Sequence, residues 1–155
     1  MPHSLDTLDR KILLAVQQDS SQSLTDLATE VQSSKTPVWN RLRKLRKLGV
    51  IKKEVAVLDP EAVGLKACFF ILIRTAQHEQ DWQTRFLAAL QQRPEIQEAH
   101  RLAGDVDYLL KVRVKDPADF DRFYQDLVAD ISIFNVTSLL SMQEILSTTA
   151  LHFDE

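Results

Sequence analysis

Glycine and proline are scarce in this chain, with three and five among 155 residues, so little sequence remains for flexible linkers. Cys68 is the only cysteine; it cannot form an internal disulfide and gives no reason to place the chain outside the cytosol. The longest strongly apolar run, residues 67–73, is far shorter than the roughly 20 residues that cross a bilayer. No basic segment followed by an apolar one opens the chain, so we expect no secretory signal. These absences predict an ordered cytoplasmic protein without a membrane span.

Basic residues are in slight deficit, with 19 Lys+Arg against 22 Asp+Glu and a formal net charge of −3. That average conceals an asymmetry. Residues 1–60 hold ten basic and seven acidic side chains, a balance of +3, whereas residues 61–155 hold nine and fifteen, a balance of −6. The basic residues concentrate at positions 41–47. Such a stripe on an acidic protein indicates either a solvated helix face or a confined DNA-binding surface.

The first fifty residues predict three helices. Asp6, Ser23 and Ser34 are suitable N-caps for them, and each precedes apolar residues at helical spacing. Only Gln32 and Ser33 separate the second helix from the third. So short a connection is typical of a helix-turn-helix rather than a generic bundle.

After Gly49, which ends the third helix, the pattern changes. Residues 50–58 are rich in β-branched side chains and predict a strand that Asp59-Pro60 terminates. We therefore divide the chain into a helix-turn-helix domain over residues 1–50, a wing and hinge linker over 51–62, and a second domain over 63–155.

The second domain alternates strands and helices. In chain order the expected elements are strand 67–75, helix 79–91, strands 96–102 and 106–114, a helix that begins at Asp116-Pro117, and strand 135–148. The order strand-helix-strand-strand-helix-strand is that of a ferredoxin-like sandwich. The predicted fold class is thus α+β, with an N-terminal winged helix-turn-helix and a C-terminal ferredoxin-like βαββαβ sandwich.

The third helix has two contrasting faces. Val38, Leu42 and Leu45 form a narrow apolar stripe that must pack on the first two helices. In a helix-turn-helix the second helix of the motif enters the major groove, and its N-terminal half meets base edges. Asn40 suits a two-point contact with adenine, and Arg43 suits one with guanine. The predicted DNA-binding residues are Ser34, Lys35, Thr36, Trp39, Asn40, Arg43, Lys44 and Lys47.

The other members of this set suit different contacts. Ser34 and Thr36 lie at the helix N-terminus, where hydroxyls and free amides can hold a phosphate. Lys44 and Lys47 are better placed for backbone phosphates. For Trp39 two interpretations remain open: contact with the DNA groove, or packing on the wing or a neighbouring subunit.

Four segments resemble the Lrp/AsnC (feast/famine) regulators in the order and spacing of that family. They are the opening helix 5–13 (LDTLDRKIL), the recognition helix and wing 34–42 (SKTPVWNRL) with Leu45 and residues 49–51, the hinge 58–60 (LDP) with Gly64, and the effector-domain turn 104–110 (GDVDYLL). The resemblance covers nearly the whole chain.

This resemblance implies a regulator that binds double-stranded DNA, forms homodimers that often assemble into octamers, and binds a small amino acid between dimers. No metal or other cofactor is implied. Carried over by position, the effector-binding residues are Ala103, Gly104, Asp105, Asp107, Tyr108, Thr137 and Ser138. An alternating strand would point Asp105 and Asp107 to one face, where either carboxylate suits a ligand's ammonium group. A turn-forming role for Asp105 is the alternative.

The chain also departs from the family pattern. Gln32-Ser33 stands where the helix-turn-helix usually has glycine and then an apolar residue, and a non-glycine residue at positive φ costs on the order of 1 kcal/mol. Ala103 replaces a hydroxyl residue common before the signature glycine. Trp39 after Thr36-Pro37, with 136–138, Met142 and Thr148-Thr149, resembles a branch that responds to cysteine.

A rival hypothesis is a small enzyme, or a stand-alone amino-acid sensor, on the ferredoxin-like fold. It would use Asp105, Asp107 and His100. No second cluster supplies a nucleophile, a phosphate loop or metal-ligand spacing, so we expect no enzyme and no metal site. The other histidines are scattered: His3, His78 and His152. Lys111, Arg113 and Lys115 alternate along one strand and predict a solvated or intersubunit face.

Overall fold

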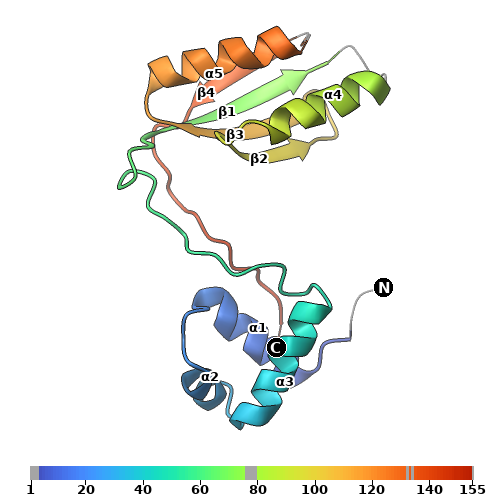
Figure 1. Cartoon of the computed structure of the whole chain (residues 1–155), viewed down its shortest axis with the longest axis vertical. Coiled ribbons are helices and arrows are strands. Elements are labelled where there is room, and N and C mark those ends of the chain that lie inside the picture. The colour runs from blue at the N-terminus through green and yellow to red at the C-terminus, as the bar shows by residue number, and fades with distance from the viewer. Residues whose placement is uncertain (1–3, 76–79, 132, 134, 155) are drawn as a thin grey trace. The chain divides into compact units, whose positions relative to one another are not determined.

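The computed structural model describes residues 4–75, 80–131, 133 and 135–154. They form two compact units, Met1–Val57 with Leu146–Glu155, and Leu58–Ile145 (Figure 1). The sequence-based division placed the C-terminal tail with the second domain. The structure instead groups the tail, from Leu146 on, with Met1–Val57, the unit that we call the head. The reason is a set of hydrogen bonds: the side-chain amide of Gln17 donates to the Leu151 carbonyl at 2.8 Å and accepts from the Leu151 amide at 2.9 Å.

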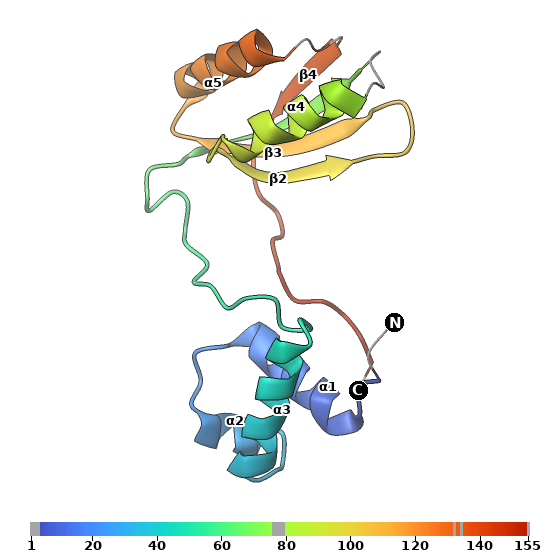
Figure 2. The ribbon, with the colours of Figure 1, turned by 45° about the vertical axis from the view of Figure 1, so that its right-hand side comes forward.

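The first unit contains the three predicted helices, α1 (Thr7–Gln18), α2 (Leu24–Glu30) and α3 (Lys35–Lys47) (Figure 2). Asp6 caps α1 by accepting from the Asp9 amide at 2.9 Å, and Ser23 caps α2 by accepting from the Asp26 amide at 3.2 Å. Both predicted caps are confirmed. The helices enclose one apolar core made of Ile12, Ala15, Leu27, Ala28, Val31, Val38, Leu42 and Leu45.

Two turns fix where α3 begins and ends. Gln32 has φ +54°, so the predicted departure from glycine does place a non-glycine residue in the left-handed region. At the other end Gly49 has φ +73°, its amide donates to the Arg46 carbonyl, and the Val50 amide donates to the Leu45 carbonyl, both at 3.0 Å. These two bonds make a Schellman motif, which satisfies carbonyls that the helix itself leaves free.

The prediction of a wing strand over residues 50–58 is wrong for this chain. The segment is extended but unpaired in the described structure, because β-branched residues favour extended backbone while a strand also needs a neighbour to bond. Glu54 instead holds the segment to α3 through Arg46, whose NH2 lies 2.7 Å from Glu54 Oε1. The last strand ends at Leu140, opposite Phe69, rather than at Thr148, and β1 itself reaches only two residues further, to Ala67.

The second unit has the predicted βαββαβ order. Its elements are β1 (Ala67–Arg74), α4 (Gln80–Gln91), β2 (Ile96–Arg101), β3 (Tyr108–Val114), α5 (Pro117–Asp130) and β4 (Asn135–Leu140). The antiparallel sheet has the order β2-β3-β1-β4. Three residues named in the sequence analysis lie outside the described residues: His3, His78 and Glu79.

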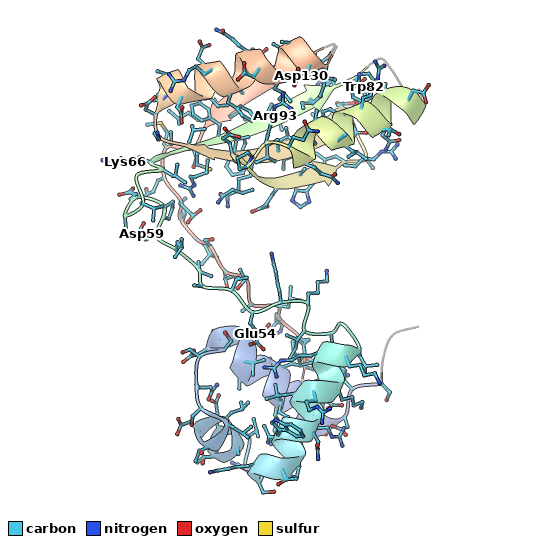
Figure 3. The ribbon with its side chains drawn as sticks, in the orientation of Figure 1. Glu54, Asp59, Lys66, Trp82, Arg93 and Asp130 are labelled. Atoms are coloured by element: carbon cyan, nitrogen blue, oxygen red, sulfur yellow. The ribbon has the colours of Figure 1, made fainter. Side chains whose placement is uncertain are left out.

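Both helices of this unit cover the same face of the sheet (Figure 2). Trp82 on α4 stacks on Phe86 with centroids 4.9 Å apart, and Phe120 on α5 stacks on Phe69 of β1 at 3.7 Å. Arg93 joins the helix ends: it donates to the Ala89 carbonyl at 2.7 Å and forms an ion pair with Asp130 on α5 (Figure 3). Among the described helices, none is both long and apolar enough to cross a membrane.

The opposite face of the sheet has no covering helix among the described residues. Phe70, Leu72 and Leu109 are half-buried there, and Leu139 is 49% exposed. This face is therefore partly apolar and lies open in the single chain.

Candidate nucleic-acid interface and effector loop

The two faces of α3 are as predicted. Val38 and Leu45 are completely buried and Leu42 is 7% exposed, so the apolar stripe lies inside the head. Trp39 is 46% exposed, and Asn40 is exposed beside it. Every other residue of the predicted DNA-binding set is also exposed: Ser34, Lys35, Thr36, Arg43, Lys44 and Lys47.

The basic side chains of α3 divide into two groups by their partners. Arg41 and Lys44 turn toward α1, where the carboxylate of Asp9 has no exposed surface. Arg41 NH1 lies 3.2 Å from Asp9 and 2.6 Å from Asp6, and Lys44 Nζ lies 3.5 Å from Asp9. These two cations therefore neutralise a buried acid and join α3 to α1.

Arg46 is also occupied, because its Nε and NH2 both donate to Glu54 Oε1. The cations of α3 that have no carboxylate partner among the described residues are Lys35, Arg43 and Lys47. Lys44 was predicted to contact phosphate; the structure gives its ammonium a first partner in Asp9, although the side chain remains 47% exposed. We call the exposed side of α3, which carries Trp39, Asn40 and Arg43, its outward face. Cations without a carboxylate partner among the described residues thus lie at both ends and at the middle of α3.

Arg43 has an aromatic partner instead of an acid. Its Cζ lies 4.6 Å from the centroid of the Trp39 ring, one helical turn earlier on the same face. A cation over an indole face is attracted by the ring quadrupole. Neither of the two interpretations of Trp39 included this contact.

Ser34 occupies the N-cap of α3 with extended backbone, but its side chain makes no capping hydrogen bond. The hydroxyl and the first amides of the helix thus remain available, and the first turn holds no acidic residue. Such an end attracts anions because of the helix dipole.

Most of the effector candidates, from Ala103 to Tyr108, lie on the hairpin between β2 and β3. Asp107 organises this loop: its amide donates to the Ile73 carbonyl at 2.9 Å, and its carbonyl accepts from the Leu102 amide at 2.8 Å. Its carboxylate accepts from the Thr75 amide at 2.7 Å. Gly104 has φ +140°, a conformation that side-chain-bearing residues rarely adopt.

The strand predicted to start at Val106 begins at Tyr108, so the idea that Asp105 and Asp107 share one strand face is wrong. Both lie in the loop, where Asp107 is tied to β1 and Asp105 is exposed. The Tyr108 side chain is buried in the core, with its ring 4.7 Å from that of Phe86. Tyr108 and Asp107 therefore anchor the loop to the core and to β1. Of the two loop aspartates, only Asp105 is exposed.

Thr137 and Ser138 are exposed on β4, opposite Leu72 and Ile71 of β1. Because β1 pairs with both β3 and β4, and Ile73 pairs with Tyr108 and with Val136, the start of β4 and the hairpin loop lie at one end of the sheet. The structure thus brings the effector candidates to one sheet end, with β1 between the two groups.

The residues of the rival hypothesis do not form a cluster. His100 contacts Glu98 on its own strand, at 3.3 Å, rather than either loop aspartate. This hydrogen bond, with that from Lys111, holds the pKa of Glu98 below its usual range. No observation among the described residues therefore favours acid–base catalysis here.

The most important residues missed from the sequence were Asp9 and Arg41. Asp9 stands three residues after the N-cap Asp6, and both halves of a capping box are present, so this spacing was the signal that could have identified it. Asp6 itself has a pKa lowered first by its bond from the Asp9 amide and then by Arg41. Arg41 is one of several cations in a basic run, and no local pattern shows that its partner is Asp9, 32 positions away.

Comparison with known proteins agrees with this geometry. Residues 5–52 match the family model of a winged helix-turn-helix DNA-binding domain, and residues 68–151 match that of the Lrp/AsnC ligand binding domain. This chain belongs to the Lrp/AsnC family. It is a DNA-binding transcription regulator of the Lrp/AsnC type, and the family expected from four sequence segments is confirmed.

Several Lrp/AsnC relatives cover nearly the whole chain. The DNA-binding transcriptional activator DecR of Escherichia coli K12 is 41% identical over 95% of this chain and 97% of its own. The crystal structure of an AsnC family regulator from Agrobacterium tumefaciens is 46% identical with TM-score 0.92, over 95% of this chain and 96% of that one. A regulator from Neisseria meningitidis in complex with L-Met is 30% identical with TM-score 0.91, over 96% and 97%.

Proposed function

We propose that this Lrp/AsnC regulator reads DNA sequence with the outward face of α3. In this account Asn40 and Arg43 contact base edges in the major groove. The residues that contact phosphates are Ser34, Lys35, Thr36 and Lys47, with Lys44 shared between phosphate and Asp9. Trp39 borders the base-contacting pair.

One observation carries this proposal: the outward face of α3 keeps its hydrogen-bond donors free while neighbouring cations are neutralised. Arg41 and Arg46 are bound to carboxylates, whereas Arg43 has none among the described residues. A guanidinium with free N–H groups can bind guanine in two-point fashion, and one that is paired to an acid cannot without losing that partner.

The test is selection of bound duplexes from a randomised pool by the full-length protein. We expect an imperfect palindrome whose half-sites are one helical turn apart, about 34 Å, or a multiple of it. R43A should relax the preference at one base pair of each half-site as well as weaken binding. Equal loss on selected and random DNA would reduce Arg43 to a phosphate contact, and enrichment of no sequence would overturn the proposal.

We further propose that a small amino acid binds at the loop 103–107 and that its ammonium group contacts Asp105. Support comes from the exposed carboxylate of Asp105 and from the relative solved with L-Met. Methionine and cysteine are the first candidates, the latter because of the sequence features near Trp39 and in the tail. Calorimetry with each of the twenty amino acids tests this: D105N should abolish binding, and Q97A on β2 is the matched control.

The working unit that we propose is a homodimer, with octamers built from it. The open sheet face supports this, because Leu139 is 49% exposed on it and Phe70, Leu72 and Leu109 are only half-buried. A second copy would cover these apolar side chains. Since DNA is the target, we place the assembly in the cytoplasm.

Sedimentation of the wild type and of L139E tests the dimer. A charge on the open face should shift the wild-type dimer toward monomer, whereas Q125E, on the exposed side of α5, should not. A monomeric wild type would contradict the proposal.

A further inference from the structure

The cations of α3 are held in two different ways, and the difference bears on what each can recognise. A carboxylate binds a guanidinium at its edge and occupies its N–H groups, as Glu54 does with the Nε and NH2 of Arg46 at 3.1 and 2.7 Å. An aromatic ring attracts the guanidinium through its face and leaves the N–H edge free. On the described part of α3, Arg43 over Trp39 is a contact of this second kind.

Trp39 contributes little to the packing of the head. Its side chain is 46% exposed, and it belongs to the outward face rather than to the core of the head. A large apolar ring in solvent costs free energy unless it gains a contact. The contact that it makes is with Arg43, which lies one turn further along the helix.

We infer that Trp39 is a positioning residue for Arg43: the ring holds the guanidinium over the helix surface, with its N–H edge ready for a base. This rests on the proposed base-reading role of Arg43. The physical reason is entropic. A free arginine samples many rotamers and must give up that freedom on binding, whereas a side chain already held by a ring loses less.

The inference predicts a coupled pattern of DNA discrimination in the full-length protein. The probe is the duplex selected by the wild type, with single base-pair changes across one half-site. R43A identifies the base pair that Arg43 reads. W39L should lower discrimination at that same base pair by about 2- to 5-fold, the range of an exposed cation–π contact, and W39F should restore most of it.

Two controls separate this role from others. K47A removes an unpaired cation on the same helix face and should weaken binding to all duplexes alike. The contact is also measured without DNA, from the ring-current shift of the Arg43 side-chain protons by NMR, which should disappear in W39L and persist in W39F. Far-UV circular dichroism verifies that each variant keeps its helices.

The outcomes are distinct. If W39L keeps the full Arg43-dependent discrimination, or loses discrimination at a different base pair, the positioning role is overturned while the proposed function stands. Absence of a ring-current shift in the wild type overturns it as well. If R43A changes no base preference although the wild type binds selectively, the proposed role of Arg43 fails first, and the positioning role fails with it.

Discussion

Arg41 on α3 reaches both carboxylate oxygens of Asp9 on α1, each at 3.2 Å, and the Asp9 side chain is completely buried. This pair joins the helix that we expect to enter the groove to the helix that supports it. A buried carboxylate requires such a partner, because an isolated charge in an apolar core is very costly. The orientation of the outward face of α3 thus depends on residues that do not themselves face DNA.

The first prediction concerns that pair. D9A should leave Arg41 without its buried partner and destabilise the head by about 2–3 kcal/mol, less than for a fully buried pair because Arg41 is 33% exposed. Urea unfolding followed by far-UV circular dichroism measures this change. E30A, which removes an exposed carboxylate from α2, is the control and should be nearly neutral. Equal stability of D9A and wild type would contradict the role assigned to the pair.

The second prediction concerns acid stability. The bond from the Asp9 amide, and then the nearby Arg41, hold the pKa of Asp6 below its ordinary value of 3.8. A carboxyl with a lowered folded-state pKa stabilises the fold above its unfolded pKa, and the contribution disappears as the pH falls through the folded pKa. The wild-type Tm should therefore decrease below about pH 4. D6N should have a lower Tm at neutral pH and a shallower acid decrease, while E30Q should follow the wild type.

The third prediction compares two adjacent cations of α3. Lys47 has no ion pair among the described residues, and Arg46 is bound to Glu54. Each phosphate contact contributes about 0.9 to the slope of log affinity against log salt. K47A should therefore reduce the slope by about 0.9, and R46A should change it much less. Titration of the selected duplex at several salt concentrations measures both slopes; identical reductions would show that the ion pair does not separate the two residues.

The fourth prediction concerns two of the three glycines that have positive φ. Gly49 has φ +73° and Gly104 has φ +140°, and an added Cβ would meet nothing within 4 Å at either position. The cost of alanine is therefore one of backbone conformation. We expect G49A to destabilise the head by about 1 kcal/mol and G104A to cost about 2–3 kcal/mol, since its φ lies beyond the left-handed helical region. Thermal unfolding measures the loss of stability in both variants. A smaller loss in G104A than in G49A would show that the loop relaxes around the alanine.

The fifth prediction concerns the C-terminal tail. Gln17 bonds to both backbone groups of Leu151, and Arg10 NH1 donates to the Asp154 carbonyl at 3.0 Å. The spacing of the two contacts is matched, because seven helical residues and three extended ones both span about 10 Å. Q17A should accelerate hydrogen exchange at the Leu151 amide, whereas Q18A, at the next position, should not. Rapid exchange in the wild type would mean that the tail is not held.

Much of this architecture could be predicted from local pattern. The caps Asp6 and Ser23 and the stripe of Val38, Leu42 and Leu45 follow from helical periodicity, which a helix expresses with little help from distant residues. The order of strands and helices in the second unit could also be predicted from local pattern. The exposure of the DNA-binding candidates followed directly, since it depends on the same periodicity.

The failures share a physical cause, which is dependence on a partner that a local pattern does not specify. Residues 50–58 have β-branched side chains but no strand beside them in the described structure, and β4 stops at Leu140, opposite Phe69 near the start of β1. The bond from the Thr75 amide to Asp107, 32 positions away, could not be predicted from the sequence either, and the effector role of Asp107 stays a prediction. Helical periodicity places Arg43 on the outward face, but it does not reveal that Arg41 has a partner, Asp9, 32 positions away.

The central claim is that the outward face of α3 lies in the major groove, with Asn40 and Arg43 on base edges. A structure of the full-length protein bound to a duplex selected from a random pool tests it most directly. The account predicts both side chains within hydrogen-bond distance of bases and Lys47 near a phosphate. A complex in which protein covers this face, or in which α3 lies outside the groove, would contradict it.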